Sequence, residues 1–147
     1  MSKIDRRRLL SAVPSLLALT ALVRPANAAG SPGLTTHMLD TAGGIPAAGV
    51  KIEFSVLEGG AYRLIHTAVT NGDGRTDEPL LTAQTMKVGQ YQIVFYIAEY
   101  FTKRGTALPN PPFLEKAVIQ FGISDATSHY HVPVLASPWS FTTYRGS

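Results

Sequence analysis

Short β-rich runs, broken at regular intervals by turn residues, constrain the fold of this 147-residue chain more than any other feature. In residues 49–57, Val50, Ile52 and Phe54 alternate with polar residues, so the apolar side chains share one face of a strand. Several such runs, separated by Gly, Pro, Asn and Asp, are typical of antiparallel β-sandwiches. The pattern predicts strands at residues 34–40, 49–57, 62–70, 90–97, 113–123, 129–137 and 140–146.

One short helix and two irregular segments complete the predicted domain. Residues 98–105 combine apolar side chains at helical spacing with a basic last turn and Gly105 as a cap. Three prolines in residues 106–112 exclude regular structure there. Residues 71–75, Asn-Gly-Asp-Gly-Arg, follow the third strand, and we expect both glycines to supply the positive φ angles of a tight reversal.

The first 28 residues have the pattern of an export signal. A basic start precedes an apolar run over residues 9–23, and an Ala-x-Ala arrangement ends at Ala28. The apolar run is shorter than the roughly 20 residues that a membrane-spanning helix needs. We therefore predict a removable signal at residues 1–28, a single domain at residues 29–147, and no membrane anchor after the signal is removed.

Arg6 and Arg7, followed by a leucine pair, resemble the twin-arginine export signal of bacteria. General secretory export is the alternative. Either route predicts a periplasmic protein, with the twin-arginine route favoured.

Charge and cysteine content exclude several classes of function. The leader holds five of the 13 basic residues but only one of the ten acidic residues, so the remaining chain has eight basic and nine acidic residues. The overall charge of +3 therefore gives no indication of a nucleic-acid partner. The chain has no cysteine, which excludes thiolate catalysis, disulfides and iron–sulfur clusters.

Two histidines project from one strand. In residues 129–134 the period of two places His129 and His131 on one face, whereas Tyr130 and Val132 face the core. A histidine on a surface strand is most often only solvated, so a functional pair and a surface pair both remain open. His37, in the first strand, is a further candidate.

Besides the histidines, Arg75 is a candidate binding residue. A guanidinium directly after a rigid turn can bind a planar anion or carbonyl, although the turn alone favours an ordinary surface arginine. The spacing of the histidines completes no known zinc motif, so no metal site is predicted. The chain also lacks the Gly-x-Ser-x-Gly elbow and the glycine-rich loops of nucleotide-binding proteins.

Five segments together resemble a known family. "LTTHMLD", "TNGDGR", "GQYQIVF", "HYHVPVLASP" and the terminal "YRGS" are similar to the 5-hydroxyisourate hydrolases, the transthyretin-like enzymes of purine catabolism. The similarity covers essentially the whole chain after the leader. The YRGS terminus is its most specific element, because transthyretin, the hormone carrier of the same fold, lacks it.

The resemblance implies an all-β, transthyretin-like (prealbumin-like) antiparallel β-sandwich of seven to eight strands with one short helix. It also implies a homotetramer with sites in a channel between dimers, and hydrolysis of 5-hydroxyisourate to 2-oxo-4-hydroxy-4-carboxy-5-ureidoimidazoline in urate degradation, without a cofactor. The residues that it implies as catalytic are His37, Arg75, His131 and Ser147, with substrate binding by His37, Arg75 and Tyr144.

Two other interpretations remain. A transthyretin-like carrier binds small ligands without chemistry, and a structural β-sandwich module would explain the strand pattern but not "HYHVP" or "YRGS". The sequence also leaves open which histidine acts as the general base.

Overall fold

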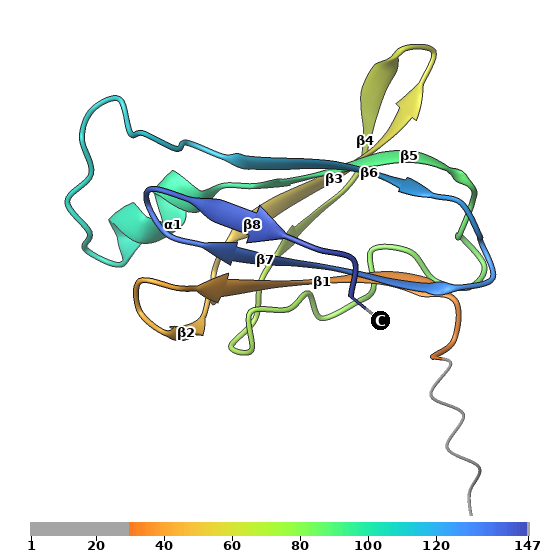
Figure 1. Cartoon of the computed structure of the whole chain (residues 1–147), viewed down its shortest axis with the longest axis horizontal. Coiled ribbons are helices and arrows are strands. Elements are labelled where there is room, and N and C mark those ends of the chain that lie inside the picture. The colour runs from red at the N-terminus through yellow and green to blue at the C-terminus, as the bar shows by residue number, and fades with distance from the viewer. Residues whose placement is uncertain (1–29, 147) are drawn as a thin grey trace, which may run out of the picture.

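The computed structural model describes residues 30–146, and these form two four-stranded sheets and one helix (Figure 1). The predicted signal at residues 1–28 and Ser147 lie outside the described residues. In chain order the elements are β1 (Gly33–Asp40), β2 (Ile45–Pro46), β3 (Lys51–Glu58), β4 (Ala61–Val69), β5 (Gly89–Phe95), α1 (Ile97–Lys103), β6 (Ala117–Ile123), β7 (His129–Ala136) and β8 (Phe141–Thr143).

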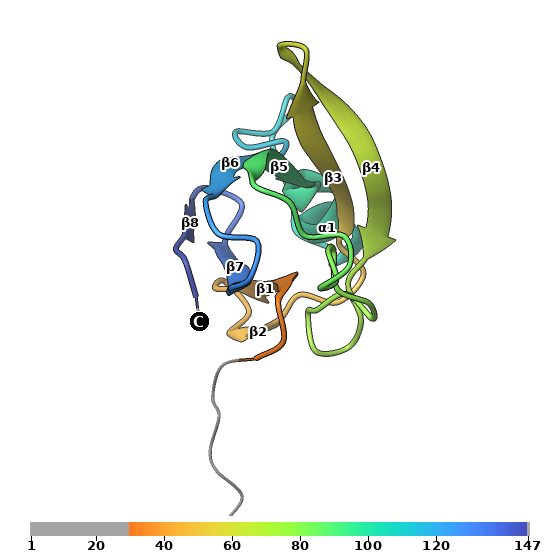
Figure 2. The same cartoon turned by 90° about the vertical axis from the view of Figure 1, so that its right-hand side faces the viewer.

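The strand order is β2-β1-β7-β8 in one sheet and β4-β3-β5-β6 in the other. Figure 2 shows the two sheets facing each other, with the β3–β4 hairpin curving away at one edge. This confirms the predicted transthyretin-like sandwich of seven to eight strands with one short helix. Neighbouring strands are antiparallel except β1 and β7, which pair in parallel along their full length.

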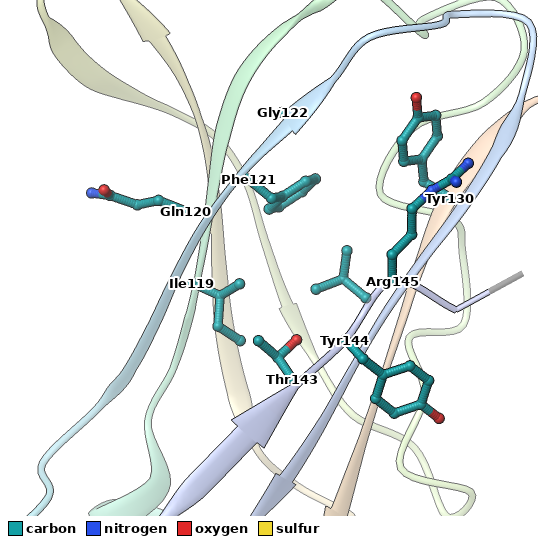
Figure 3. Close-up of a pocket in the computed structure, with 9 residues that line it drawn as sticks. Ile119, Gln120, Phe121, Gly122, Tyr130, Thr143, Tyr144 and Arg145 are labelled. Carbon is teal, nitrogen blue, oxygen red and sulfur yellow. The ribbon is translucent and has the colours of Figure 1, made fainter.

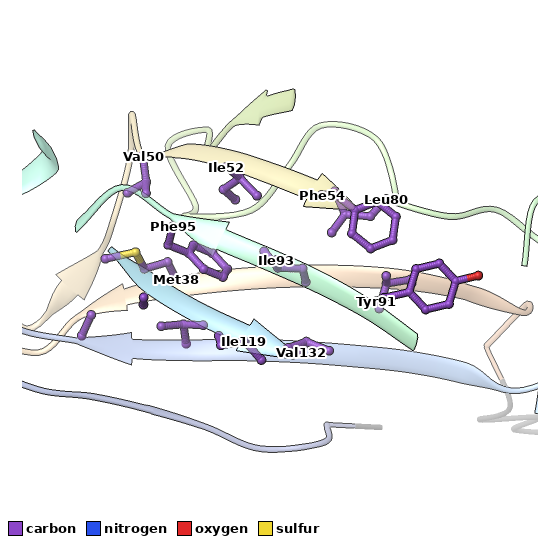
Figure 4. Close-up of a cluster of buried hydrophobic side chains, with 14 of the residues drawn as sticks. Met38, Val50, Ile52, Phe54, Leu80, Tyr91, Ile93, Phe95, Ile119 and Val132 are labelled. Atoms are coloured by element: carbon purple, nitrogen blue, oxygen red, sulfur yellow. The ribbon is translucent and has the colours of Figure 1, made fainter. Parts of the chain in front are cut away.

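The core lies between the sheets and is built from the predicted inward faces (Figure 4). Val50, directly before β3, and Ile52 and Phe54 of β3 are fully buried, and Val132 of β7 joins the same cluster from the inner face of the opposite sheet. Because the inward residues of β7 are apolar, its alternate residues must face away from the core. The two histidines of this strand are therefore placed on the outer surface by the same pattern that fixes the core.

Element boundaries differ from the prediction where an apolar run continues into another structure. The run at residues 90–97 stays a strand only to Phe95, and Ile97 begins α1, because periodicity alone cannot separate a short buried strand from a buried helix. The strand predicted at 113–123 begins only at Ala117, and Phe113 lies before it as an exposed residue. Among the described residues, no helix has the length and apolar character to cross a membrane.

The turn predicted at residues 71–75 requires correction. Gly74 has a positive φ of 73°, but Gly72 does not, and the segment does not close a hairpin. Because β3 lies between β4 and β5, the chain cannot return directly to its neighbour. Instead it passes along the edge of β1 that faces away from β7, where the amide of Met38 donates to the carbonyl of Gly74 (2.8 Å). This crossing brings the turn to the first sheet.

Candidate active site

The two candidate histidines lie side by side on the outer face of the first sheet. The parallel register sets Thr35 opposite His131 and His37 opposite Pro133, so His37 and His131 occupy neighbouring strands on one face. Their ring centroids are 6.4 Å apart. Residues separated by 94 positions in the chain therefore form one imidazole pair.

Arg75 reaches this pair through the rigid turn beside β1. The side-chain oxygen of Asn71 accepts hydrogen bonds from the amides of Asp73 (3.0 Å) and Arg75 (3.2 Å), which fixes the turn. Arg75 then forms an isolated antiparallel bridge with His37. Among the described residues, no carboxylate forms an ion pair with Arg75. Its guanidinium is consequently available to a ligand at the histidine face.

Gly74 makes this approach possible. Its φ is positive, and a Cβ there would overlap the carbonyl oxygen of Met38 and lie 3.2 Å from Cδ2 of His37. Only glycine combines this backbone conformation with so close a contact. The second glycine of the turn thus determines how near Arg75 comes to His37.

The end of the chain forms the other side of the site. The amide of Gly146 donates to the carbonyl of His131 (2.8 Å), continuing the antiparallel register that pairs Val134 with Thr143. This register places Tyr144 opposite Pro133, with 60% of its surface exposed. Arg145 points the other way and stacks on Tyr130, with its guanidinium carbon 4.7 Å from the ring centroid.

Figure 3 shows this alternation: Arg145 extends toward Tyr130, while the Tyr144 ring points away from it. The residues drawn there line a hollow between β6 and β8. That hollow lies on the inner side of β8, whereas the histidines lie on the outer side. The candidate site is therefore an open face of the sheet and not this hollow.

The structure thus brings together His37, Arg75 and His131, with Gly146 beside them. Ser147 lies outside the described residues. His66 lies apart on β4 of the other sheet. No three metal-binding side chains cluster within residues 30–146. Sequence reasoning missed Thr35 and Gly146, although the spacing of two between Thr35 and His37 already placed both on one strand face.

Comparison with known proteins shows the family of this chain. The sequence model of the HIUase/Transthyretin family matches residues 34–146. The chain belongs to this family. "5-hydroxyisourate hydrolase 2" of Rhizobium meliloti (strain 1021) is 54% identical over 114 residues, which cover 78% of this chain and 95% of the relative.

The chain is also similar to solved structures. The crystal structure of (S)-allantoin synthase shares 43% identity and a TM-score of 0.74 over 81% of this chain. The match covers 45% of that protein, so the chain spans less than half of its length. The structure of Klebsiella pneumoniae 5-hydroxyisourate hydrolase has a TM-score of 0.64 and 33% identity, over 78% of this chain and 98% of that protein.

Both imidazoles of this HIUase/Transthyretin family member are held toward the neutral form. Burial lowers the pKa of His37 most, and the charge of Arg75 lowers it further, against a hydrogen bond with the backbone of Asp73 that raises it. Burial likewise lowers the pKa of His131, followed by the charges of Arg75, His37 and His129. A neutral imidazole can accept a proton, so both side chains are suited to general base catalysis.

Replacing Arg75 with glutamine is expected to raise the pKa of both His37 and His131, because the substitution removes a positive charge that disfavours their protonation. In the unaltered protein both should titrate below the ordinary histidine value of about 6.5. Since the unfolded chain then binds more protons than the folded one below about pH 6.5, acidification through this range destabilises the fold. Proton NMR titration of the imidazole signals measures these values.

The matched control is Arg63→Gln, because Arg63 pairs with Glu58 on the other sheet. Arg63→Gln should leave the pKa values of His37 and His131 unchanged. Equal shifts in the two variants would show that Arg75 does not act on the pair.

Proposed function

We propose that the chain hydrolyses 5-hydroxyisourate to 2-oxo-4-hydroxy-4-carboxy-5-ureidoimidazoline, as an enzyme of urate degradation. The observation that carries the proposal is the convergence, beside Gly146, of two imidazoles with lowered pKa values and a guanidinium that forms no ion pair among the described residues. The 54% identical relative is named for the same reaction.

The reaction requires a base and a stabiliser of negative charge. Water adds to a ring carbonyl carbon, the adjacent carbon–nitrogen bond breaks, and the proton that water loses is finally delivered to the departing nitrogen. Of the two histidines, one orients the water and the other accepts its proton. Arg75 binds the planar substrate and stabilises the charge that develops on the carbonyl oxygen. These roles need no cofactor or metal.

The terminal residues supply the remaining contacts in this proposal. Tyr144 lies on the outer face of the sheet, level with His37, and offers a ring edge and a hydroxyl to the substrate. Ser147 adds a hydroxyl in this proposal. The hydrogen bond between Gly146 and His131 supports this assignment, because it holds the chain end against the catalytic strand.

A carrier of small apolar ligands fits the face less well. Such a carrier needs an apolar lining, whereas His37, His131 and Arg75 make this face polar and cationic. A structural module of the same fold would not require lowered pKa values at His37 and His131.

The proposal is tested by following the ultraviolet absorbance of freshly generated 5-hydroxyisourate with the purified protein. The protein should accelerate the decay, and His131→Ala should lower kcat/KM by about 100- to 10,000-fold, the usual contribution of a general base. His66→Ala is the matched control and should retain full activity, because His66 lies on the other sheet. Decay at the spontaneous rate with the unaltered protein would refute the hydrolase assignment.

The proposed assembly is a homotetramer in which a second copy covers the histidine face. His131 faces away from its own core, so it can line a water-poor cleft only if another subunit closes over it. Tyr144, which is 60% exposed on the same face, supports such a contact. Sedimentation equilibrium should give about four times the chain mass, and a fully active monomer would contradict the arrangement.

The proposed location is the periplasm. This rests on the export pattern at residues 1–28, with the arginine pair favouring the twin-arginine route and leaving a mature chain that begins near Ala29.

A further inference from the structure

A hydroxyl lies between the two histidines of β7. Oγ1 of Thr35 is 2.9 Å from Nδ1 of His131 and 3.3 Å from Nε2 of His129. Nδ1 of His129 in turn lies 3.3 Å from the carbonyl oxygen of Ser31. The three side chains belong to the outer face of the first sheet, because the parallel register sets Thr35 opposite His131 and Gly33 opposite His129, and Ser31 precedes β1. They form one continuous chain of hydrogen bonds.

The carbonyl at the end of this chain fixes its direction. A carbonyl oxygen can only accept, so a neutral His129 must carry its proton on Nδ1 and its lone pair on Nε2. The Thr35 hydroxyl then donates to that lone pair. Its own oxygen remains free to accept from Nδ1–H of His131. The neutral ring of His131 consequently has its lone pair on Nε2, the nitrogen that is not engaged by Thr35.

We propose that Thr35 and His129 are positioning residues that hold His131 in the Nδ1–H tautomer and make its Nε2 the base of the reaction. This inference rests on the proposed function and identifies which histidine takes the proton. Water transfers a proton to Nε2 of His131 while its oxygen bonds to the substrate carbonyl carbon. The resulting imidazolium of His131 keeps its Nδ1–H hydrogen bond to Thr35. It passes the new proton from Nε2 to the departing nitrogen of the substrate as the substrate's carbon–nitrogen bond breaks.

The hydrogen-bonded relay of His131, Thr35 and His129 has neither the position nor the burial of a purely structural feature. Thr35 and His129 also line a shallow groove with Pro79 and Leu81 at the start of β1, so the relay lies at the surface and not in the core. Thr35 does not contribute to the core packing, because the core faces of β1 and β7 are filled by Leu34, Met38 and Val132. The relay therefore adds to the site and not to the sandwich.

The kinetic test compares two substitutions at one position. Thr35→Val keeps the side-chain shape and removes the hydroxyl, so kcat should fall about 10- to 100-fold with little change in KM, as expected for loss of one hydrogen bond to a group that becomes charged. Thr35→Ser restores the hydroxyl and should restore kcat. The acidic limb of the kcat profile should move to lower pH in Thr35→Val, because the imidazolium loses an acceptor.

A double substitution tests whether His129 acts through Thr35. His129→Phe alone should lower kcat by less than Thr35→Val, since Thr35 can still accept from His131. Combined with Thr35→Val it should cause no additional loss, because the relay is already broken. Fully additive losses, or an unaltered kcat in Thr35→Val, would overturn the relay.

A spectroscopic test reads the tautomer without any turnover. Nitrogen-15 NMR of the purified protein, labelled at its four histidines, should show the proton of neutral His131 on Nδ1, and in Thr35→Val the proton should redistribute to Nε2. The His66 signals should not change. A proton on Nε2 of His131 in the unaltered protein would refute the relay even if hydrolysis is observed. Conversely, the expected spectra without hydrolysis would preserve the relay and refute only the proposed function.

Discussion

Removal of residues 144–147 is expected to lower kcat/KM by at least about 100-fold while the sandwich stays folded. The chain end forms one wall of the site: the amide of Gly146 bonds to the carbonyl of His131, and Tyr144 presents its ring on the same face. The core does not depend on these residues, since the buried apolar cluster is complete without them. Activity toward 5-hydroxyisourate and circular dichroism of the truncated protein measure the two effects separately.

A single substitution isolates the contact between the chain end and the histidine. A Cβ on Gly146 would lie 2.8 Å from Cδ2 and 3.1 Å from Cβ of His131, so Gly146→Ala must displace the ring or the chain end. The matched control is Gly122→Ala on β6, where a Cβ meets only the flexible side chain of Gln90 at 3.6 Å. Full activity of the truncated protein would show that the chain end does not belong to the site.

Gly74→Ala is expected to destabilise the fold by about 3 kcal/mol and to reduce activity as well. The positive φ of 73° is strained for any residue with a Cβ, and that Cβ would overlap the carbonyl oxygen of Met38. The hydrogen bond from the Met38 amide to the Gly74 carbonyl must then lengthen, which moves Arg75 away from His37. Urea unfolding and the hydrolysis assay measure the two losses.

Gly72→Ala is the control from the same turn. Gly72 does not have a positive φ, and a Cβ there would meet no atom within 4 Å. Its unfolding midpoint and activity should therefore match those of the unaltered protein. If the two variants were equally stable, the close approach of Gly74 to β1 would have no energetic importance.

Local patterns predicted much of the fold because the signals are local. Alternation placed Val50, Ile52 and Phe54 in the core and turned His129 and His131 outward, and the structure confirms both. Boundaries were wrong where apolar runs continue, as at Ile97, because burial and not local pattern decides where such a strand ends.

The individual candidates of the site also came from the sequence, but their arrangement did not. His37 and Arg75 were chosen from separate segments, and nothing in either segment indicates that the two backbones bridge. The interpretation of residues 71–75 as a tight reversal was wrong, because the strand order β4-β3-β5 sends this segment to the other sheet. No local pattern singles out Thr35, since its hydroxyl gains a role only from His129 and His131 on the neighbouring strand.

The sequence by itself determined which side chains are buried and which face outward, because the period of two acts along one strand. Only the tertiary structure decided that β1 lies in parallel beside β7, that the turn carrying Arg75 crosses to β1, and that Gly146 closes on His131. Such contacts join residues distant in the chain, and their geometry follows from how the two sheets pack and connect. A local pattern carries no information about that packing.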